Sequence, residues 1–289
     1  MILNEEAIQK LIEECDNINE TGMSSYWVEY LRGFKMENGK FSAKGLPEGE
    51  GVNKKTIIHE LIHYLLQTPF RFQGKQFKEF QKILRTAKKV HELRNNKMGL
   101  GTLRQVVALA FLEDQIKISQ VTEPIIIIGD GFGLMSSLIL SHFPQLIGKV
   151  VLVNLTQNLL IDAAFIRKSV SEVNVALVKN EIEYEKALKS NGVRCILIQA
   201  DNLKLIANEN IGLAINICSM QEMNPNIIVE YFNSIRESKN SKTYFYCANR
   251  VEKVLPDGTT VNFFEYPWHS KDKVFVDELC PWQQKYYSI

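Results

Sequence analysis

The sequence predicts an α/β protein with a doubly wound, mostly parallel β-sheet, preceded by an all-helical N-terminal region. Two observations lead to this prediction. From residue 124 onward, short apolar runs without alternation are separated by helix-compatible segments, as strands buried on both faces of a parallel sheet require. Before about residue 118, apolar residues recur at helical spacing. We therefore expect a helical domain over residues 1–118 and a sheet domain over residues 119–289.

The helical region is punctuated by recognisable helix ends. Asn4 and Asn53 are suited to begin helices as N-caps, and Pro69 follows the end of one apolar stripe. The Gly-, Asn- and Glu-rich stretch over residues 35–53 is expected to be a loop. The expected helices cover residues 4–15, 24–34, 54–68, 74–94 and 103–115.

The sheet region begins with runs typical of buried parallel strands and ends with runs typical of an antiparallel pair. Parallel strands are expected at residues 125–128, 149–155, 194–200, 211–218 and 242–249. After a turn at Asp257-Gly258, two apolar runs over residues 258–268 and 273–279 have no helix between them. We therefore expect an antiparallel pair that closes the sheet.

Composition excludes several classes of partner and location. Lys and Arg number 34 and Asp and Glu number 33, so no global charge attracts nucleic acid or an anionic membrane. The basic series over residues 76–97 is interrupted by Glu79 and Glu92, which is typical of a solvated helix face. No apolar run approaches the roughly 20 residues of a membrane span, and the five cysteines form no CxxC pair. A reduced, cytoplasmic protein that acts on a small molecule is the expectation.

A glycine-rich turn follows the first strand. Gly129, Gly131 and Gly133 lie between a buried run and a helix, where glycine permits a tight turn and close approach of a ligand. The spacing is GxGxG rather than the dinucleotide fingerprint GxGxxG, and no P-loop lysine follows. A ligand-binding turn is favoured by the strands that follow, although a turn without ligand would have the same spacing.

Polar residues follow the later strands, at the edge where an open α/β sheet binds its ligand. Asn154 ends the second expected strand, where an acidic residue commonly binds ribose hydroxyl groups. Asp201 and Asn202 follow the third, as either adenine-binding or helix-capping residues. The fourth and fifth strands are followed by Asn216, Ser219, Gln221, Glu222, Asn249 and Arg250.

Four segments resemble a known family. GDGFG, NICSMQEMNPNIIVEYFNSI, YFYCANR and FFEYPW are similar to the sugar O-methyltransferases, which are S-adenosylmethionine-dependent enzymes with a Rossmann-like fold, and the likeness covers about residues 98–289. The resemblance implies that S-adenosylmethionine is the cofactor and that a sugar or similar polar molecule is the acceptor. It implies a cofactor site made of Gly129, Asp130, Gly131, Gly133, Asn154, Asp201, Asn202 and Asn216. The acceptor side would be formed by Ser219, Gln221, Glu222, Asn249 and Arg250.

Two residues depart from that pattern. Asp130 occupies a position where such turns often have a small residue, and Asn154 stands where the family usually has Asp. A neutral hydrogen bond is about half as strong as a charge-assisted one. A methyltransferase-like protein that binds without catalysis is therefore an alternative.

Methyl transfer to a hydroxyl group requires a base near the acceptor oxygen. His269, Glu222 and Asp272 are the candidates, and His269 has a suitable ordinary pKa but also the position of an exposed loop residue. Tyr266 and Trp268 are suited to stack on a sugar ring, or to pack in the core. Arg250 would bind a carboxylate or phosphate of the acceptor, or lie at the surface.

A second class of function competes with this one. His59 and His63 belong to an HExxH sequence, which places two imidazoles one helical turn apart as in zinc hydrolases. No third ligand follows at the usual spacing, and both histidines flank an apolar stripe that fits a core-facing helix. The zinc hydrolase is retained as the alternative to the methyltransferase.

Overall fold

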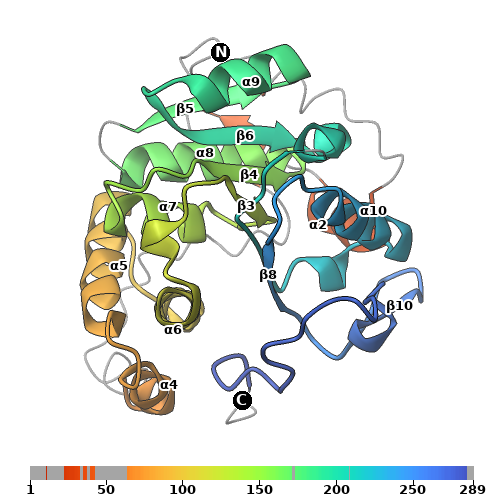
Figure 1. The fold of residues 1–289 in the computed structure, drawn as a ribbon. Helices are drawn as coiled ribbons and strands as arrows, with labels where there is room; N and C mark the ends of the chain where they lie inside the picture. Colours follow the sequence, from red (N-terminus) through yellow and green to blue (C-terminus); the bar gives the residue numbers. More distant parts are fainter. Residues whose placement is uncertain are drawn as a thin grey trace.

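The computed structural model describes residues 11, 23–32, 35–37, 40–42, 64–170, 173–207 and 209–284. Its centre is a six-stranded sheet in which every neighbouring pair is parallel, in the order β5-β6-β4-β3-β7-β8 (Figure 1). The strands are β3 (Ile125–Ile128), β4 (Val150–Asn154), β5 (Asn174–Val178), β6 (Val193–Gln199), β7 (Leu213–Ile217) and β8 (Tyr244–Ala248). The predicted α/β class and parallel sheet are confirmed.

Strand β5 at the sheet edge was not predicted from the sequence. Its five residues lie between two helices, and its first residue, Asn174, is exposed. Such a short run is compatible with either a strand or a helix, and only its pairing with β6 decides between them.

Helices cover both faces of the sheet (Figure 1). On one face, Ile125 and Ile127 belong to a core shared with α7 (Leu134–His142) and α8 (Thr156–Ser169). On the other, Ile126 and Ile128 pack in a core with α9 (Glu181–Lys189) and α10 (Pro225–Arg236). All four residues of β3 are therefore buried, which explains their unbroken apolar sequence.

The helices before the sheet extend one of these cores. They are α4 (Thr68–Gly74), α5 (Phe80–Arg94) and α6 (Leu100–Ile116). Ile83 of α5 and Leu109 of α6 are fully buried in the same cluster as Ile127. Helix α5 packs on α7 and α8, whereas α6 lies beside α7 with its Phe111 ring against Tyr246 of β8, and α4 packs on α6. A domain boundary near residue 118 stays a prediction.

The remaining N-terminal elements are short. The expected helix near residues 24–34 is present as α2 (Ser25–Tyr30). The expected loop over residues 35–53 contains an antiparallel pair, β1 (Lys35–Glu37) and β2 (Lys40–Ser42), so that part of the loop prediction was wrong. Apart from Leu11, the helix expected over residues 4–15 lies outside the described residues, as do residues 54–63 of the next one.

The expected antiparallel pair of residues 258–268 with 273–279 is not formed, and a different C-terminal pair is present that does not extend the sheet. It is a separate two-stranded sheet formed by β9 (Glu252–Val254) and β10 (Thr260–Asn262), joined through Gly258 at φ +87°. Residues 273–279 form no strand, and Val274, Phe275 and Val276 are each more than half exposed. The prediction that this run closes the sheet was wrong, because its apolar side chains are not buried against a sheet face.

Among the described helices, none has both the length and the apolar character needed to cross a membrane.

Candidate functional site

The chain reverses its direction of travel across the sheet at β3. From β3 it proceeds to β4, β5 and β6 on one side, where β6 lies between β4 and β5, and it then returns to β7 and β8 on the other. The connections after β3 and β7 therefore diverge and leave a crevice at the carboxyl ends of these strands. A cavity of about 150 Å³ lies there, and residues after β3, β4 and β7 line it together with Trp27 and Tyr30 of α2.

The glycine turn has an unusual backbone. Gly129, Gly131 and Gly133 have φ of +67°, +60° and +57°, and Phe132 has φ of +62°. A left-handed conformation at a non-glycine residue costs roughly 1–2 kcal/mol and persists only where the surroundings enforce it. The ring of Phe132 is held edge to face against Phe165 of α8, with 5.6 Å between ring centroids.

At two of the three glycines there is also no room for a side chain. A Cβ at Gly129 would clash with the Ser219 side chain, and one at Gly133 would lie 2.8 Å from the carbonyl oxygen of Asp162. A Cβ at Gly131 would meet nothing within 4 Å, although Gly131 lines the cavity. Gly131 is therefore the glycine that leaves room for a ligand.

Asp130 occupies the N-terminus of α7. Its two carboxylate oxygens accept hydrogen bonds from the backbone N–H groups of Met135 and Ser136, both at 2.7 Å. A helix N-terminus at this place in a sheet is the usual binding site for a ligand phosphate. In this protein the Asp130 carboxylate occupies the position that a bound anion would take.

A second buried carboxylate lies beside the first. Asp162 of α8 accepts hydrogen bonds from the Gly133 N–H at 2.7 Å and from Nδ2 of Asn154 at 2.8 Å. Burial, with the Asp130 carboxylate nearby, raises the pKa of Asp162 to about 8. Asp162 therefore retains a proton at neutral pH in the cavity wall.

A buried arginine supports this pair from α5. The Arg94 guanidinium donates to the Gly133 carbonyl at 3.1 Å, to Ser137 Oγ at 2.8 Å and to Ser169 Oγ. Its positive charge lowers the pKa of both carboxyl groups, against the larger opposite effect of burial. Helix α5 thus fixes the glycine turn through Arg94.

Asn154 faces the cavity with its polar atoms already engaged. Its Nδ2 donates to Asp162, and its Oδ1 accepts from the Leu155 N–H at 3.0 Å. Asn158, one helical turn further on, also lines the cavity and donates to Asn154 Oδ1 at 3.4 Å. To bind Asn154, a ligand hydroxyl group would have to replace one of these existing hydrogen bonds.

Three predicted site residues bond to one another instead of facing the cavity. Asn216 Oδ1 accepts from Asn249 Nδ2 at 2.8 Å, and Asn249 Oδ1 accepts from the Gln221 N–H at 3.2 Å. Asn216 also donates to the Ile128 carbonyl at 3.0 Å and is fully buried. Buried amides require such partners, so these residues brace the ends of β3, β7 and β8, and none lines the cavity.

Glu222 does line the cavity, within a small polar cluster. Its carboxylate lies 2.7 Å from Nζ of Lys253, and both side chains are mostly buried. The hydroxyl group of Tyr26 hydrogen-bonds to Glu222, and burial together with this carboxylate raises the pKa of Tyr26 to about 12. Lys253 Nζ also lies 3.8 Å from the centre of the Tyr26 ring.

The segment after β7 brings two further residues to the cavity. Cys218 has φ of +57°, and its N–H donates to the Ala248 carbonyl at 2.8 Å, so the turn after β7 is fixed to the end of β8. Burial raises the pKa of the Cys218 thiol, which keeps it protonated. Ser219 lies against the glycine turn.

A smaller cavity of about 50 Å³ adjoins the first. Its walls are mainly apolar and include Leu155, Ala200, Met223 and Ile227. Asp201 and Asn202 follow Ala200 in the chain but do not line this cavity, and Asp201 is exposed. A flat apolar group would fit there better than a charged one.

His269 and the aromatic residues before it lie away from both cavities. The exposed His269 is linked through Asp272 to Arg236, at the end of α10 that is opposite to the crevice. Trp268 packs on Phe232 of α10 with 4.9 Å between ring centroids, and Tyr266 is buried in the same aromatic cluster. Tyr266 and Trp268 fit the packing alternative and His269 fits the alternative of an exposed loop residue, and the structure does not bring His269 near Glu222.

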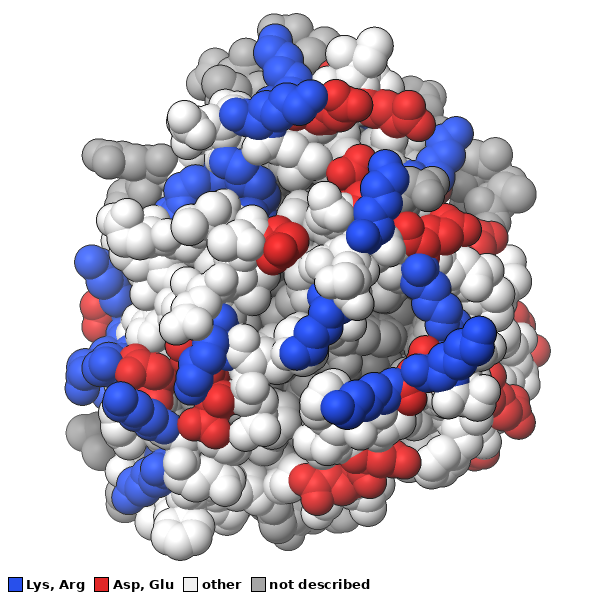
Figure 2. Space-filling model, viewed as in Figure 1, with Lys and Arg blue, Asp and Glu red and all other residues white. Residues whose placement is uncertain are grey.

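Arg250 follows β8 and is exposed. Its charge lowers the pKa of both Tyr26 and Cys218, against the larger effect of burial in each case, but Arg250 lines neither cavity. Over the face drawn in Figure 2, basic and acidic side chains of the described residues are interspersed and form no extended field of one sign.

Several cavity residues were not predicted from the sequence. Asn158 and Asp162 lie one helical turn apart on α8, four and eight residues after the predicted Asn154, a signal that the sequence contains. Trp27 and Tyr30 had no such signal, because α2 is almost 200 residues distant in the chain from its contacts after β7.

The HExxH residues His59 and His63 lie outside the described residues. Within the part of the chain that the structure describes, no group of three or more His, Cys, Asp or Glu side chains has a metal-binding arrangement.

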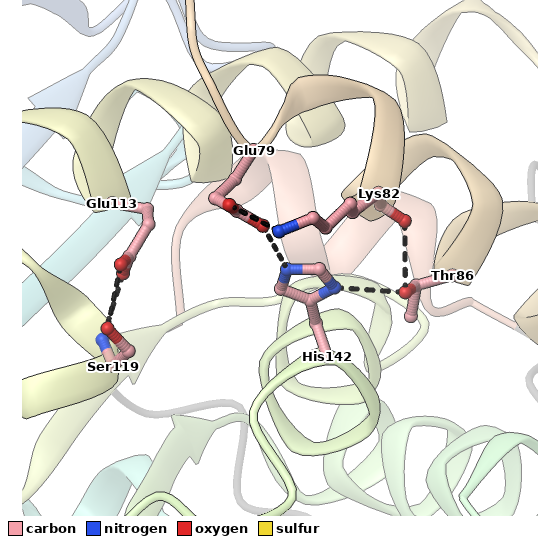
Figure 3. A network of polar contacts seen from close by, with 6 residues as sticks. All are labelled: Glu79, Lys82, Thr86, Glu113, Ser119 and His142. Carbon is pink, nitrogen blue, oxygen red and sulfur yellow. Dashed lines mark hydrogen bonds and ion pairs between the residues drawn. The ribbon is translucent and has the colours of Figure 1, made fainter.

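A second polar network lies at the far end of α7 (Figure 3). The ring of His142 lies between Glu79 and Thr86 of the α5 region, with Nε2 3.6 Å from Glu79 Oε2 and Nδ1 3.0 Å from Thr86 Oγ1. Burial lowers the pKa of His142, in spite of the opposing effect of Glu79. This network joins α5 to α7 and is separated from the cavities by the length of α7.

No family model matches the chain, and no curated protein matches it either. Its function therefore has to be inferred from the site.

Proposed function

We propose that this protein is an S-adenosylmethionine-dependent methyltransferase with a Rossmann-like sheet, acting on a hydroxyl group of a sugar or similar polar small molecule. The observation that carries the proposal is the glycine turn at the point where the chain reverses across the sheet, with the Asp130 carboxylate at the helix N-terminus behind it. The likeness of GDGFG and SMQEM to sugar O-methyltransferases agrees with it.

The charge at the turn favours this cofactor over a phosphate-bearing one. A dinucleotide would bring its pyrophosphate to the N-terminus of α7, where it would meet Asp130. A cofactor with a sulfonium and an ammonium group and without phosphate avoids that repulsion, and the Asp130 carboxylate in the cavity wall favours its positive charge.

The two cavities suit the two ends of such a cofactor. Its polar amino-acid end fits the larger cavity beside Gly131, and its adenine ring fits the apolar walls at Leu155 and Ala200. Its ribose would then lie at Asn154, which lines both cavities. The neutral amide of Asn154 and its existing hydrogen bonds make this a weaker ribose contact than a free carboxylate would be.

Glu222 is our choice for the base. The cofactor supplies an electrophilic methyl group, and the protein has to hold the acceptor oxygen in line with it. As the oxygen–carbon bond forms and the carbon–sulfur bond breaks, with its electron pair remaining on sulfur, Glu222 takes the hydroxyl proton. Lys253 at 2.7 Å holds the carboxylate in place, and the exposed Arg250 would attract a negatively charged acceptor.

Incubation with methyl-labelled S-adenosylmethionine and fractionated polar metabolites, with sugars among them, tests the proposal. The wild-type protein should transfer label to a hydroxyl-bearing compound. Glu222→Gln should reduce kcat by about 10²–10⁴-fold because the base is lost. Glu252→Gln, at an exposed neighbouring position on β9, is the matched control.

Two results would contradict parts of this proposal. Equal kcat in the wild type and Glu222→Gln would remove Glu222 from the mechanism. Cofactor binding without transfer to any fraction would favour the alternative of a methyltransferase-like binding protein, for which the engaged Asn154 is the supporting observation.

A further inference from the structure

Trp27 separates the two cavities. Three residues line both cavities, namely Trp27, Asn154 and Ser219. Asn154 and Ser219 belong to the ends of sheet strands, whereas Trp27 comes from α2, far away in the sequence. The partition between the cavities is thus contributed in part by an element outside the sheet.

The cavities are too small in this arrangement for a cofactor that spans both. Their volumes are about 150 and about 50 Å³. Pockets that enclose ligands of cofactor size measure roughly 300–1,000 Å³. A ligand extending from Gly131 to Ala200 would have to pass between Trp27 and Asn154, so the Trp27 side chain has to move before such a ligand binds.

Helix α2 is attached in a way that permits this movement. It has only six residues, and none of them is buried. Its attachments near the N-terminus are single hydrogen bonds, from Ser24 Oγ to the Glu222 carbonyl at 2.5 Å, from the Asp257 N–H to Ser25 Oγ at 3.2 Å and from Asn224 Nδ2 to the Met23 carbonyl at 3.4 Å. A helix this short has little stability of its own in water, so contacts to the rest of the protein determine its position.

The strongest of these contacts is made by Tyr26. Its ring contacts the Lys253 ammonium group, and its hydroxyl group hydrogen-bonds to Glu222. Lys253 is also paired with Glu222, so this one lysine contacts Tyr26 directly and holds the carboxylate to which Tyr26 bonds. We call Tyr26, Glu222 and Lys253 the latch of α2.

We propose that Trp27 is a gating residue of the cofactor site: its indole closes the middle of the groove while the latch holds α2, and it moves to admit an adenosyl ligand and then covers it. This inference rests on the proposed function for the identity of the ligand. The gate itself follows from the two cavities and the latch.

Binding kinetics of S-adenosylhomocysteine distinguish a gate from a simple contact. For Trp27→Ala, we expect the association and dissociation rate constants both to rise by about tenfold or more, because the barrier to entry and exit is removed. Tyr30→Ala is the matched control, since Tyr30 lies on the same helix but lines only the larger cavity. Trp27→Phe, which retains a smaller ring, should fall between wild type and Trp27→Ala.

Other outcomes overturn the gate. If Trp27→Ala accelerates dissociation alone, Trp27 is a stacking contact. If it changes neither rate constant, Trp27 has no role in binding. Equal acceleration in Tyr30→Ala would assign the effect to the helix as a whole.

Amide hydrogen exchange tests the gate without any ligand. The amides of α2 should exchange faster than those of α10 by about a hundredfold or more, through opening that leaves the sheet folded. Lys253→Met should accelerate α2 further, whereas Lys242→Met, whose ammonium contacts Tyr244 outside the cavities, should not. Exchange of α2 as slow as that of α10 would overturn the gate.

The two proposals fail in different ways. If neither wild type nor Trp27→Ala binds S-adenosylhomocysteine while α2 exchanges rapidly, the proposed function is wrong and the gate stands. If wild type binds with rates that Trp27→Ala does not change, the function stands and the gate is wrong.

Discussion

At the scale of single residues, Asp162 has the most unusual electrostatic environment of the cavity wall. It is fully buried, Asp130 lies beside it, and Arg94 is the nearby positive charge. Burial and the Asp130 charge outweigh the hydrogen bonds from Asn154 and Gly133, so its pKa is raised to about 8. The protein therefore binds a proton here that the unfolded chain releases near pH 4.

The raised pKa predicts how stability depends on pH. The contribution of Asp162 is fully present below pH 4 and is lost as pH rises through 8, because the folded state binds the extra proton in that window. The loss approaches about 1.4 kcal/mol per pH unit at most. Asp162→Asn should therefore flatten the decline in the free energy of unfolding between pH 6 and 8, as measured by urea denaturation.

A serine-to-alanine substitution provides the control for that measurement. Ser234 is buried on α10, whose core lies on the other face of the sheet, and it has no ionisable group, so Ser234→Ala should retain the wild-type pH dependence. A slope for Asp162→Asn equal to that of wild type would show that Asp162 is ionised in the folded protein.

Individual residue types at strand ends were predictable, but their roles were not. The sequence predicts that Asn216, Gln221 and Asn249 lie at the same edge of the sheet. It does not predict that they bond to one another, because those bonds depend on the pairing of β7 with β8 and on the turn at Cys218. Side chains that satisfy each other in this way are unavailable to a ligand.

At the scale of elements, α7 connects two different polar environments. Its N-terminus is capped by Asp130 at the cavity, and its last residue is His142 in the network of Figure 3. A cap of this kind contributes about 1–2 kcal/mol to stability. The far network fixes α7 to α5, and α5 in turn holds the glycine turn through Arg94.

The lowered pKa of His142 predicts a loss of stability in acid. Because the folded pKa is depressed, its contribution is present above the ordinary pKa of about 6.5 and is lost as pH falls through the folded value. His142→Asn should reduce the loss of unfolding free energy between pH 6.5 and 5. Thermal denaturation across this range, with the exposed His269→Asn as control, measures it.

An unchanged acid dependence in His142→Asn would contradict this expectation. It would mean that protonated His142 is accommodated by Glu79, whose carboxylate lies 3.6 Å away.

Elements with local signals were predicted better than those without. Strand β3, the glycine turn and α7 follow from one continuous stretch of sequence, whose apolar run and glycines specify a strand followed by a tight turn. Residues 273–279 have an apolar composition typical of a strand but no sheet face to pack on. The position of α2 depends on contacts with residues after β7 and β8, which no local pattern encodes.

At the scale of the whole molecule, the sheet order creates the site. The reversal at β3 opens a crevice, α5 to α8 support it from one side, and α2 covers its mouth. The near-balanced charge of the chain leaves the local carboxyl groups to determine which ligand charge is favoured. The central claim is that this crevice binds an adenosyl cofactor without phosphate.

Isothermal titration of the wild type, Gly131→Ala and Gly101→Ala tests this claim most directly. A methyl group at either glycine meets no neighbouring atom, but Gly131 lies in the cavity wall at φ +60° whereas Gly101 lies on α6. We expect wild type and Gly101→Ala to bind one S-adenosylhomocysteine per chain, Gly131→Ala to bind at least about tenfold more weakly, and NAD to produce no heat. Absence of S-adenosylhomocysteine binding at millimolar concentration, or tighter binding of NAD, would contradict the account.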